Sequence, residues 1–371
     1  MAERDWVVWM STKFPLEIPA ALGLTVYCPE SGAAAAAGRG QGGELCRTAE
    51  GLGYARDPCS YVRMGMAMAH NPRSAGGLPR PDALLCCSNI CSGMVQWYEA
   101  MARTLNVPLF LVDFPYAQEG GEEVTAYVGG QLRAAIRGLE ALTGRRWEED
   151  TFAQVCRQAN RCADAWQQVL DTAQRRPAPL ESMEVFDYMP LMVTGRCRRE
   201  TEEQLLALVR RLEQRSPLPL ERARFRVYWE GTPCWPVLGE VLPMLEERGI
   251  QVVADTISQS LSFRYENLDG LIRAYCSTIN GVSLETGLEQ RLAVCRRYGV
   301  DGVLVHYNRS CRPWCGSLQE VERRLGQVLG VPVAAFSGDQ GEAAAFVRAQ
   351  FATRLDALVE QMEGRQEALI C

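Results

Sequence analysis

The stretch that decides the fold is ALLCCSNICSGMVQWYEAMARTLNVPLFLV, residues 83–112. It opens with a short apolar run, Ala83–Cys87, and closes with another, Pro108–Val112. Between them, from Gly93 to Thr104, apolar side chains recur at helical spacing, which predicts an amphipathic helix. Apolar runs of this length are typical of strands that are buried on both faces of a parallel sheet. The stretch therefore predicts a strand–helix–strand unit with a right-handed crossover.

The same alternation of short apolar runs and helical patterns continues on both sides of this unit. Two further strands are predicted before it, at Trp6–Met10 and Leu24–Tyr27. In the C-terminal part, four strands are predicted at Phe225–Trp229, Gln251–Ala254, Gly302–Val305 and Val331–Phe336. The helices predicted there are Pro236–Arg248, Leu284–Tyr298, Leu318–Leu329 and Gly341–Glu363.

The middle of the chain has a different pattern. Glu122–Leu142, Thr151–Gln174 and Thr201–Gln214 read as three amphipathic helices without strands between them. We therefore expect an α/β protein with two small parallel-sheet domains, Rossmann- or flavodoxin-like, and a helical segment between them. The expected division is 1–120 for the N-terminal α/β domain, 121–220 for the helical segment and 221–371 for the C-terminal α/β domain.

Composition narrows the possible functions. The formal net charge of −6 argues against nucleic acid as a partner, because phosphate binding needs a basic surface. The sequence has neither of the glycine-rich phosphate-binding patterns GxGxxG and GxxxxGK[ST], so we expect no nucleotide site in this chain. A basic leader with an apolar core is absent from Met1–Met10, and no apolar stretch is long enough to span a bilayer. We expect a soluble, cytoplasmic protein without a membrane partner.

The chain has fifteen cysteines but only two histidines, His70 and His306. Disulfides are rare in a reducing compartment, so the cysteines are metal ligands, reactive thiols or buried small residues. The shortage of histidine excludes a His-rich zinc site and leaves few candidates for Ser-His-Asp catalysis. Any metal chemistry must rest on thiolates or carboxylates.

Three of the cysteines follow predicted strands or begin predicted helices. Cys91 lies four residues after the strand Ala83–Cys87, at the start of the helix near Gly93, and Cys311 lies six residues after the strand Gly302–Val305. Cys59 stands at a loop-to-helix transition. Open α/β sheets bind ligands at the carboxyl ends of their strands. A helix N-terminus there favours a thiolate or an anionic cluster.

Three thiolates on an iron–sulfur cubane would leave the fourth iron open, as a catalytic metal site requires. Taken singly, however, each of these cysteines is more typical of a small buried residue than of a ligand. The sequence has no CxxCxxC run and no paired CxxC, so spacing alone does not distinguish a cluster from buried thiols.

Five stretches of the sequence contain longer motifs. They are FPLEIPAALG at residues 14–23, CSYVR at 59–63, SNIC at 88–91 with WYE at 97–99, NRSC at 308–311, and GDQ at 338–340 with AQ at 349–350 and TR at 353–354. In the same order, they resemble the P-x-E-I-x-x-A-x-G, CSY-x-R, NNIC…WYE, NRSC and GDQ…AQ…TR motifs of one known family, the 2-hydroxyacyl-CoA dehydratases and benzoyl-CoA reductases. That family includes D-component-like dehydratase subunits and double-cubane proteins.

The resemblance implies a pair of α/β domains that enclose one [4Fe–4S] cluster, with Cys59, Cys91 and Cys311 as its ligands. It also implies an acyl-CoA substrate and an ATP-hydrolysing iron–sulfur activator protein that delivers a low-potential electron. In the dehydratases, that electron gives a ketyl-type radical anion that expels the 2-hydroxyl group. The benzoyl-CoA branch reduces an aromatic ring instead. The expected assembly is a heterodimer with a related subunit or a homodimer.

The sequence also departs from the family pattern at several cysteines. Cys315 stands where the family has serine, and Cys86, Cys87 and Cys276 are additional thiols. Related proteins hold a double-cubane [8Fe–9S] cluster on two cysteine triplets and reduce small molecules. Cys87, Cys276 and Cys315 could supply a second triplet, or they could be buried thiols. A third possibility is a subunit that scaffolds a partner and in which any cluster only relays electrons.

Four further residues are candidates by position. Glu99 lies on the predicted helix after Cys91 and could act as a base, or be a solvated helix residue. His306 ends a strand near Cys311 and could face a cluster or a substrate. Arg309 and Arg312 could neutralise an anionic cluster or bind thioester or phosphate oxygens, or be surface charges.

Overall fold

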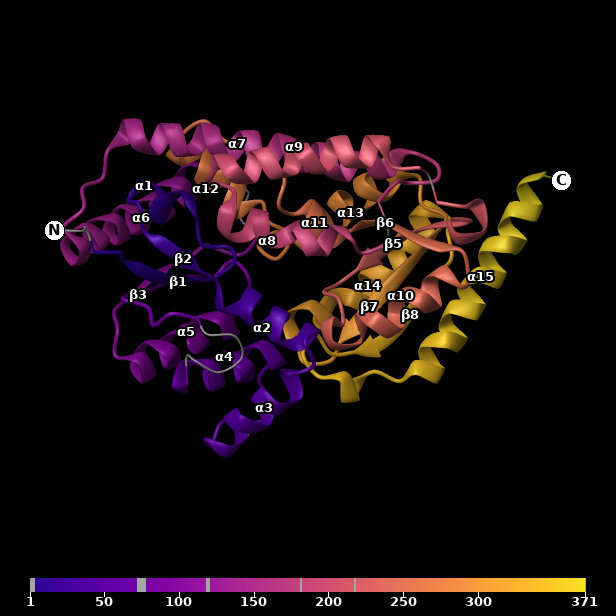
Figure 1. Cartoon of the computed structure of the whole chain (residues 1–371), viewed down its shortest axis with the longest axis horizontal. Helices are drawn as coiled ribbons and strands as arrows, with labels where there is room; N and C mark the ends of the chain where they lie inside the picture. The colour runs from indigo at the N-terminus through magenta and orange to yellow at the C-terminus, as the bar shows by residue number, and fades with distance from the viewer. Residues whose placement is uncertain (1–3, 72–77, 118–120, 181, 217, 371) are drawn as a thin grey trace.

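A computed structural model describes residues 4–71, 78–117, 121–180, 182–216 and 218–370. It contains two four-stranded sheets, and every strand pair in them is parallel. The expected α/β fold with two parallel sheets is confirmed. The sheets lie at the two ends of the long axis, with the N-terminal half on the left of Figure 1 and the C-terminal half on the right.

The N-terminal sheet has the strand order β2-β1-β3-β4. Its side chains alternate between two cores, with Leu84 and Cys86 packed toward α4 and α5, and Leu85 and Cys87 packed toward α1 and α6. Its strands are β1 Val7–Met10, β2 Thr25–Tyr27, β3 Ala83–Cys87 and β4 Leu109–Val112. The helices of this half are α1 Glu17–Ala21, α2 Pro29–Gly38, α3 Gly42–Gly51, α4 Ser60–His70, α5 Ser92–Leu105 and α6 Glu122–Thr143.

The C-terminal sheet has the order β6-β5-β7-β8. Helices α13 and α14 pack together against it, and so do α10 and α15. Its strands are β5 Phe225–Glu230, β6 Ile250–Asp255, β7 Gly302–Asn308 and β8 Val333–Gly338. The helices are α10 Leu238–Glu246, α11 Thr256–Gln259, α12 Leu268–Cys276, α13 Leu284–Tyr298, α14 Arg312–Leu329 and α15 Arg348–Ile370. Short 3₁₀ turns are η2 Thr172–Gln174, η3 Leu220–Arg222, η4 Trp235–Val237 and η5 Ala343–Ala345.

The two sheets have the same topology. In each sheet, the first strand in the sequence (β1 or β5) lies between the second and the third. The first connection therefore leads to the strand on one side of it, and the second connection leads to the strand on its other side. Right-handed crossovers then place the two connections on opposite faces. Such a reversal leaves a crevice at the carboxyl ends of the strands, where open α/β sheets bind ligands. Each half therefore offers a ligand site at its β1–β3 or β5–β7 boundary.

The middle of the chain connects the two halves. Its helices are α7 Glu149–Asp171, α8 Val185–Gly195 and α9 Arg199–Gln214, and α7 packs along α9 at the top of Figure 1. Phe152 near the start of α7 belongs to the N-terminal core, whereas Trp166 near its end belongs to the C-terminal core. Conversely, Ile272 and Tyr275 of α12 pack in the N-terminal core. The chain thus crosses between the halves more than once, and the domain boundaries expected above stay a prediction.

One difference from the sequence-based elements matters for the site. The helix predicted at Leu318–Leu329 begins at Arg312, and the preceding strand extends to Asn308. Proline is favoured in the first turn of a helix because its missing N–H has no partner there anyway, and Pro313 occupies that turn. The long loop expected around Cys311 is therefore short, and Cys311 is the residue at which α14 starts.

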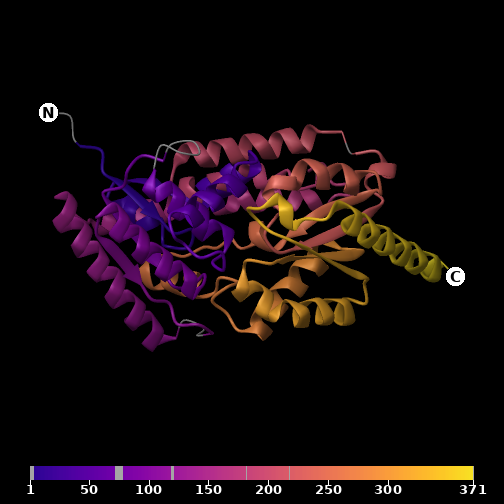
Figure 2. The ribbon, with the colours of Figure 1, turned by 90° about the horizontal axis from the view of Figure 1, so that it is seen from below.

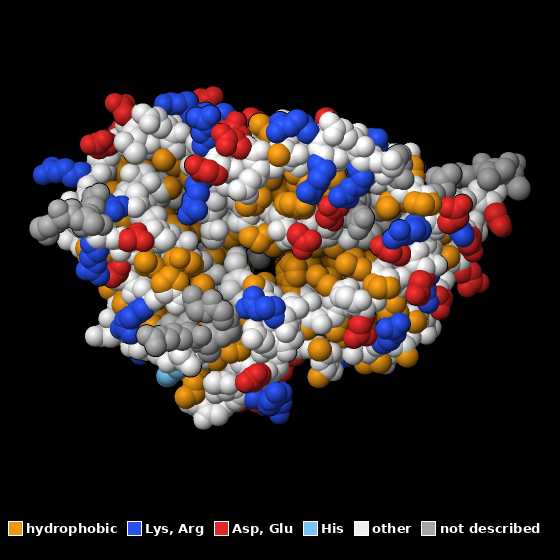
Figure 3. All heavy atoms as spheres, viewed as in Figure 1, with side chains coloured by type: hydrophobic (Ala, Val, Ile, Leu, Met, Phe, Trp, Pro, Cys, Tyr) orange, Lys and Arg blue, Asp and Glu red, His pale blue; other side chains and the backbone are white. Residues whose placement is uncertain are grey.

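The outer surface is consistent with a compact two-lobed body. The face seen in Figure 3 is hollowed near its centre, and hydrophobic side chains gather on both sides of the hollow. In the second view, α15 extends away from the body and carries the C-terminus to the end opposite the N-terminus (Figure 2). Over the described ranges, no helix has both the length and the apolar character that a bilayer crossing requires.

Candidate functional site

Three cysteines occupy the same local position in three different helices. Cys59 is the N-cap of α4, Cys91 the N-cap of α5 and Cys311 the N-cap of α14. All three are free and partly exposed, whereas most of the other described cysteines are buried. Helix N-termini carry unpaired N–H groups and a partial positive charge, so they stabilise anions. Each thiol therefore lies beside backbone N–H groups that can offset part of the charge of a thiolate.

The three thiols are close enough for their charges to act on one another. Burial raises the pKa of Cys59 to about 11, and the negative charge of Cys91 adds to that increase. Burial also raises the pKa of Cys311 to about 12, with further contributions from the charges of Cys59 and Cys91. Backbone N–H groups of the helix first turns act in the opposite direction, including those of Tyr61 and Trp314. The three cysteines, distant in sequence, thus lie in one region of the folded chain.

The donor set can be tested against the kinds of metal group that it could hold. Among the described residues, no group of three or more His, Cys, Asp and Glu side chains is placed to hold a single metal ion. The thiolates of a cubane each bind a different iron, so their sulfur atoms stand farther apart than the ligands of one ion. Three free thiols within electrostatic reach of one another, each beside the first N–H groups of a helix, have the chemistry to hold an anionic iron–sulfur cluster with one open iron.

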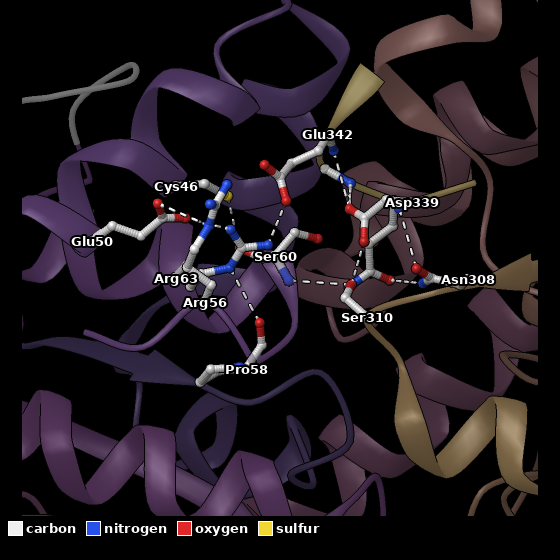
Figure 4. A network of polar contacts seen from close by, with 12 residues as sticks. Cys46, Glu50, Arg56, Pro58, Ser60, Arg63, Asn308, Ser310, Asp339 and Glu342 are labelled. Atoms are coloured by element: carbon white, nitrogen blue, oxygen red, sulfur yellow. Dashed lines mark hydrogen bonds and ion pairs between the residues drawn. The ribbon is translucent and has the colours of Figure 1, made fainter. Parts of the chain in front are cut away.

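A network of polar contacts connects the loops that carry Cys59 and Cys311 (Figure 4). The backbone N–H of Ser60 donates to Ser310 Oγ at 3.3 Å, and that hydroxyl donates to the carboxylate of Asp339. Asp339 also accepts from the backbone N–H groups of Gly341, at 2.7 Å, and Glu342, at 3.0 Å. Asp339 therefore holds the residue before Cys311, which in turn holds the residue after Cys59.

Arg63 strengthens the same junction from α4. Its side chain is 5% exposed; Nε donates to the carbonyl of Pro58 at 3.2 Å, and the guanidinium pairs with Glu50 and Glu342. Pro58 directly precedes Cys59, so Arg63 fixes that loop to the segment after β8. The approach is close, because a Cβ on Gly341 would lie 2.7 Å from Ser60 Cβ. The motifs CSYVR, NRSC and GDQ thus meet in one network.

The loop that carries Cys91 is held by the C-terminal half of the chain. Asn89 Nδ2 donates to the carbonyl of Tyr275 at 3.2 Å, and Asn280 Nδ2 donates to the carbonyl of Ile90 at 3.4 Å. Cys87 donates to Asn89 Oδ1 at 2.7 Å and fixes the amide from the other side. Each of the three cysteine loops is therefore held by residues that are distant from it in sequence.

A buried carboxylate, Glu30, lies within electrostatic reach of Cys91. It stands in the first turn of α2, after β2, and accepts hydrogen bonds from the Thr12 backbone at 2.9 Å and the Tyr98 hydroxyl at 3.0 Å. Burial raises the pKa of Glu30, and its negative charge raises the pKa of Cys91. Sequence reasoning missed this residue. The available signal was an acidic residue just after a predicted strand, Leu24–Tyr27, at the ligand-binding edge of the sheet.

A cavity of about 290 Å³ adjoins the cysteines. Cys91 and Ser92 form part of its wall, and Trp314, three residues after Cys311, forms another part. A second cavity, of about 470 Å³, shares Ile279 and Arg291 with the first. A small molecule can therefore reach the neighbourhood of the thiols through space that the protein leaves open.

The sequence matches one protein family over residues 11–362, described as 2-hydroxyglutaryl-CoA dehydratase, D-component. The chain belongs to this family. It is 35% identical to (R)-2-hydroxyglutaryl-CoA dehydratase, subunit alpha, of Acidaminococcus fermentans, over 97% of this chain and 92% of that protein.

Two further relatives show how far the family extends. The chain is 36% identical to the (R)-phenyllactyl-CoA dehydratase alpha subunit of Clostridium sporogenes, over 98% of this chain and 91% of that protein. It is 23% identical to one of the subunits of the benzoyl-CoA reductase of Thauera aromatica, over 91% and 84% of the two chains. The resemblance inferred from the motifs is confirmed, and the homologues include dehydratase subunits.

For this member of the dehydratase family, the structure places the other candidate residues at varied distances from the three cysteines. Glu99 lies on an exposed face of α5. His306 is fully buried, between the carbonyl of Thr232 and the thiol of Cys234, and burial lowers its pKa to about 4. Both neighbours belong to the C-terminal half. The buried imidazole, with its lowered pKa, is a neutral core residue. Catalytic roles for Glu99 and His306 stay predictions.

The two candidate arginines differ from each other. Arg309 is exposed in the short loop before Cys311. Arg312 is exposed and pairs with Asp57 at 3.4 Å, two residues before Cys59. Arg312 therefore spans the two cysteine loops at the surface, where an ion pair contributes little energy. Contacts of either arginine with an anion or a substrate stay predictions.

The three cysteines considered for a second cluster lie in different environments. Cys87 and Cys276 are buried in the N-terminal core. Cys315 is partly exposed in the first turn of α14, where its thiol donates to the carbonyl of Asn308 at 3.0 Å. Its charge also contributes to the raised pKa of Cys311. Cys315 is therefore close to the first triplet, and a second triplet stays a prediction.

Proposed function

We propose that this chain is the iron–sulfur subunit of an (R)-2-hydroxyacyl-CoA dehydratase, with a [4Fe–4S] cluster held by Cys59, Cys91 and Cys311. The observation that carries the proposal is that these three cysteines are each the N-cap of a helix, and that Cys91 also lines a cavity. Membership of the dehydratase family supports the same reaction, since relatives of 33–36% identity are named as dehydratase alpha subunits.

The residues of this chain have distinct tasks in that reaction. The helix amides at the three N-caps offset the negative charge of the thiolates and of any anion between them. Such a cluster, when bound, would supply one low-potential electron to the thioester, which would favour loss of the 2-hydroxyl and make the β-proton acidic. Glu30, a carboxylate with a raised pKa, is suited to accept a proton near Cys91.

The proposed assembly has two further proteins. The names of the relatives describe alpha subunits, so a second, related subunit is the expected companion. Because the sequence has no phosphate-binding motif, ATP hydrolysis is assigned to a separate iron–sulfur activator that transfers the electron.

The proposal is tested by reconstitution under anaerobic conditions. Protein purified with its companion subunit should convert a 2-hydroxyacyl-CoA to the enoyl-CoA when activator, ATP and a strong reductant are all present. Omitting ATP should abolish turnover, whereas an iron count of about four per chain should remain. A preparation with full iron that neither binds nor dehydrates any acyl-CoA would exclude this function. An iron count near eight would indicate the double-cubane alternative.

A second prediction concerns Asp339, which connects the loops of Cys59 and Cys311 through the hydroxyl of Ser310. Within the described chain, the hydrogen bonds of its carboxylate are to Ser310, Gly341 and Glu342 and not to a thiol. Replacing it with alanine removes three hydrogen bonds at once. We expect iron release to a chelator to become about 10–100-fold faster, the usual effect of losing a supporting contact around a metal site. Asparagine keeps an acceptor oxygen in the same place, so Asp339→Asn should restore much of the retention.

The control is Asp269→Ala, which removes an exposed aspartate of α12 and should leave iron release unchanged. If Asp339→Ala releases iron at the rate of the unmodified protein, the network of Figure 4 does not position the cysteine loops.

A further inference from the structure

We propose that the cavity beside Cys91 receives the acyl chain of the substrate and selects an uncharged chain, aliphatic or aromatic, over one that ends in a carboxylate. This inference rests on the proposed function and names its substrate class. The relatives differ on this point, because their names include a glutaryl, a phenyllactyl and an isocaproyl substrate.

The position of the cavity assigns it to the acyl chain. Its lining includes Cys91, one of the three proposed ligands, and Trp314 in the first turn of α14, the helix that Cys311 caps. A thioester that reacts at this point places its acyl chain in the adjoining space. At about 290 Å³, the cavity lies at the lower limit of ligand sites, so it suits an acyl group and not a whole CoA ester.

Much of the lining is apolar. Eight of its side chains are hydrocarbon or indole: Ile90, Ile279, Val282, Leu284, Pro313, Trp314, Leu318 and Val321. Burying an aliphatic or phenyl chain against them is favourable by about 25 cal/mol per Å² of apolar surface removed from water. The polar side chains in the described lining carry hydroxyl and amide groups and one thiol, together with a single arginine. Apart from that arginine, these side chains carry no positive charge that could pair with a carboxylate.

That arginine, Arg291, is already bound to other groups. Its Nε and Nη2 atoms donate to the two carboxylate oxygens of Glu230, each at 2.9 Å, and Nη1 donates to the carbonyl of Gly287 at 2.9 Å. Glu230 is fully buried and also accepts from Thr256 Oγ1 at 2.6 Å. The guanidinium lies 5.2 Å from the centre of the Trp314 ring.

The consequence is that, among the described lining residues, no cationic side chain is left without a carboxylate partner. A ligand carboxylate would have to compete with Glu230 for Arg291, and winning that competition would leave Glu230 buried without its ion partner. Removing one partner of a buried ion pair is strongly unfavourable. A carboxylate at the end of the acyl chain should therefore weaken binding by a factor of about ten or more, whereas an uncharged chain meets no such penalty.

The test is a comparison of dissociation constants for unreactive esters on the anaerobic holoprotein. Isocaproyl-CoA and 3-phenylpropionyl-CoA carry uncharged chains and lack the 2-hydroxyl group, and glutaryl-CoA supplies the carboxylate. By calorimetry, both uncharged esters should bind at least about tenfold more tightly than glutaryl-CoA. Equal or tighter binding of glutaryl-CoA would overturn this inference while leaving the dehydratase function intact. If none of the three esters binds, the proposed function fails, and this inference fails with it.

A pair of variants tests whether charge in the cavity sets the preference. Ser317 lines the cavity from an exposed position on α14, so Ser317→Arg adds a cation with little risk to folding. It should tighten glutaryl-CoA binding by about tenfold and reduce the difference between the esters. Gln319→Arg adds the same charge two residues further along the helix, outside the cavity lining, and should leave the ratio unchanged. A ratio that shifts equally in both variants would show that the preference does not arise in this cavity.

Discussion

Serine in place of Cys59, Cys91 or Cys311 should remove bound iron and abolish dehydration. A hydroxyl is a poor ligand for a cluster iron. Each variant would therefore leave only two thiolate ligands, from two of the three helices. Loss of a mere supporting contact lowers metal affinity about 10–100-fold, so loss of a ligand should exceed that range. Iron and sulfide analysis on anaerobically purified variants measures the effect directly, and the visible absorption of the cluster should disappear in parallel.

Cys197→Ser is the matched control for this series. Cys197 is also free and partly exposed, but it borders the N-terminal core and does not contribute to the raised pKa of Cys59, Cys91 or Cys311. Its replacement should leave the iron content unchanged. Cys315→Ser adds a useful comparison, because a fall of about one half in iron would support two cubanes. Full iron in any of the three ligand variants would exclude that cysteine as a ligand.

Glu30→Gln should lower turnover by a factor of about 10²–10⁴, the usual range for losing a general base, while iron content and acyl-CoA binding persist. Glutamine keeps the shape of the side chain and an acceptor for the Thr12 N–H, and its NH2 group can donate to the Tyr98 hydroxyl oxygen, so the fold should be retained. The measurement is kcat in the reconstituted assay, together with the dissociation constant of an unreactive ester. Exchange of the β-proton with solvent deuterium should fall in proportion to turnover.

The comparison for Glu30 is made with two other carboxylates. Glu44→Gln changes an exposed side chain of α3 and should leave kcat unchanged. Glu99→Gln tests the base suggested by the sequence alone, whose carboxylate is exposed on α5. If Glu99→Gln abolishes turnover and Glu30→Gln does not, the base is Glu99 and the role assigned to Glu30 is wrong.

The regular part of the fold could be predicted because its signals are local. All eight strands of the two sheets overlap the apolar runs identified in the sequence, and Ala83–Cys87 agrees at both ends. A strand buried on both faces has to be apolar along its length, so it is visible without any partner. The helix Leu284–Tyr298 has the bounds that the sequence predicts, helped by the Ser283 cap and by Gly299 at its end.

The helices between β2 and β3 are harder to predict, for a physical reason. Much of α2 is a run of alanine, which has high helix propensity but no contrast between an apolar and a polar face. The start of α14 escapes prediction because its first turn contains charged and small residues, and only Pro313 indicates a helix there.

For the site, the sequence could provide candidate ligands but not their arrangement. The position of Cys91 and Cys311 after equivalent strands follows correctly from the alternation of strands and helices. The contacts that bring Cys59 to them are long-range, such as Ser60 with Ser310 and Arg63 with Glu342. No local pattern encodes such pairs. For the same reason, the hydrogen bonds of Asp339 and the electrostatic effect of Glu30 on Cys91 could not be predicted from the sequence and are known only from the structure.

The seam between the two halves has a thermodynamic consequence. Two of the three proposed ligands belong to the N-terminal half and the third to the C-terminal half, so a metal group held by all of them would act as a cross-link. Binding and association of the two halves are thermodynamically linked. If contact between the halves strengthens binding of the group, the bound group must stabilise that contact by the same free energy. If exposure to oxygen destroyed the metal group, the protein would then lose stability as well as activity.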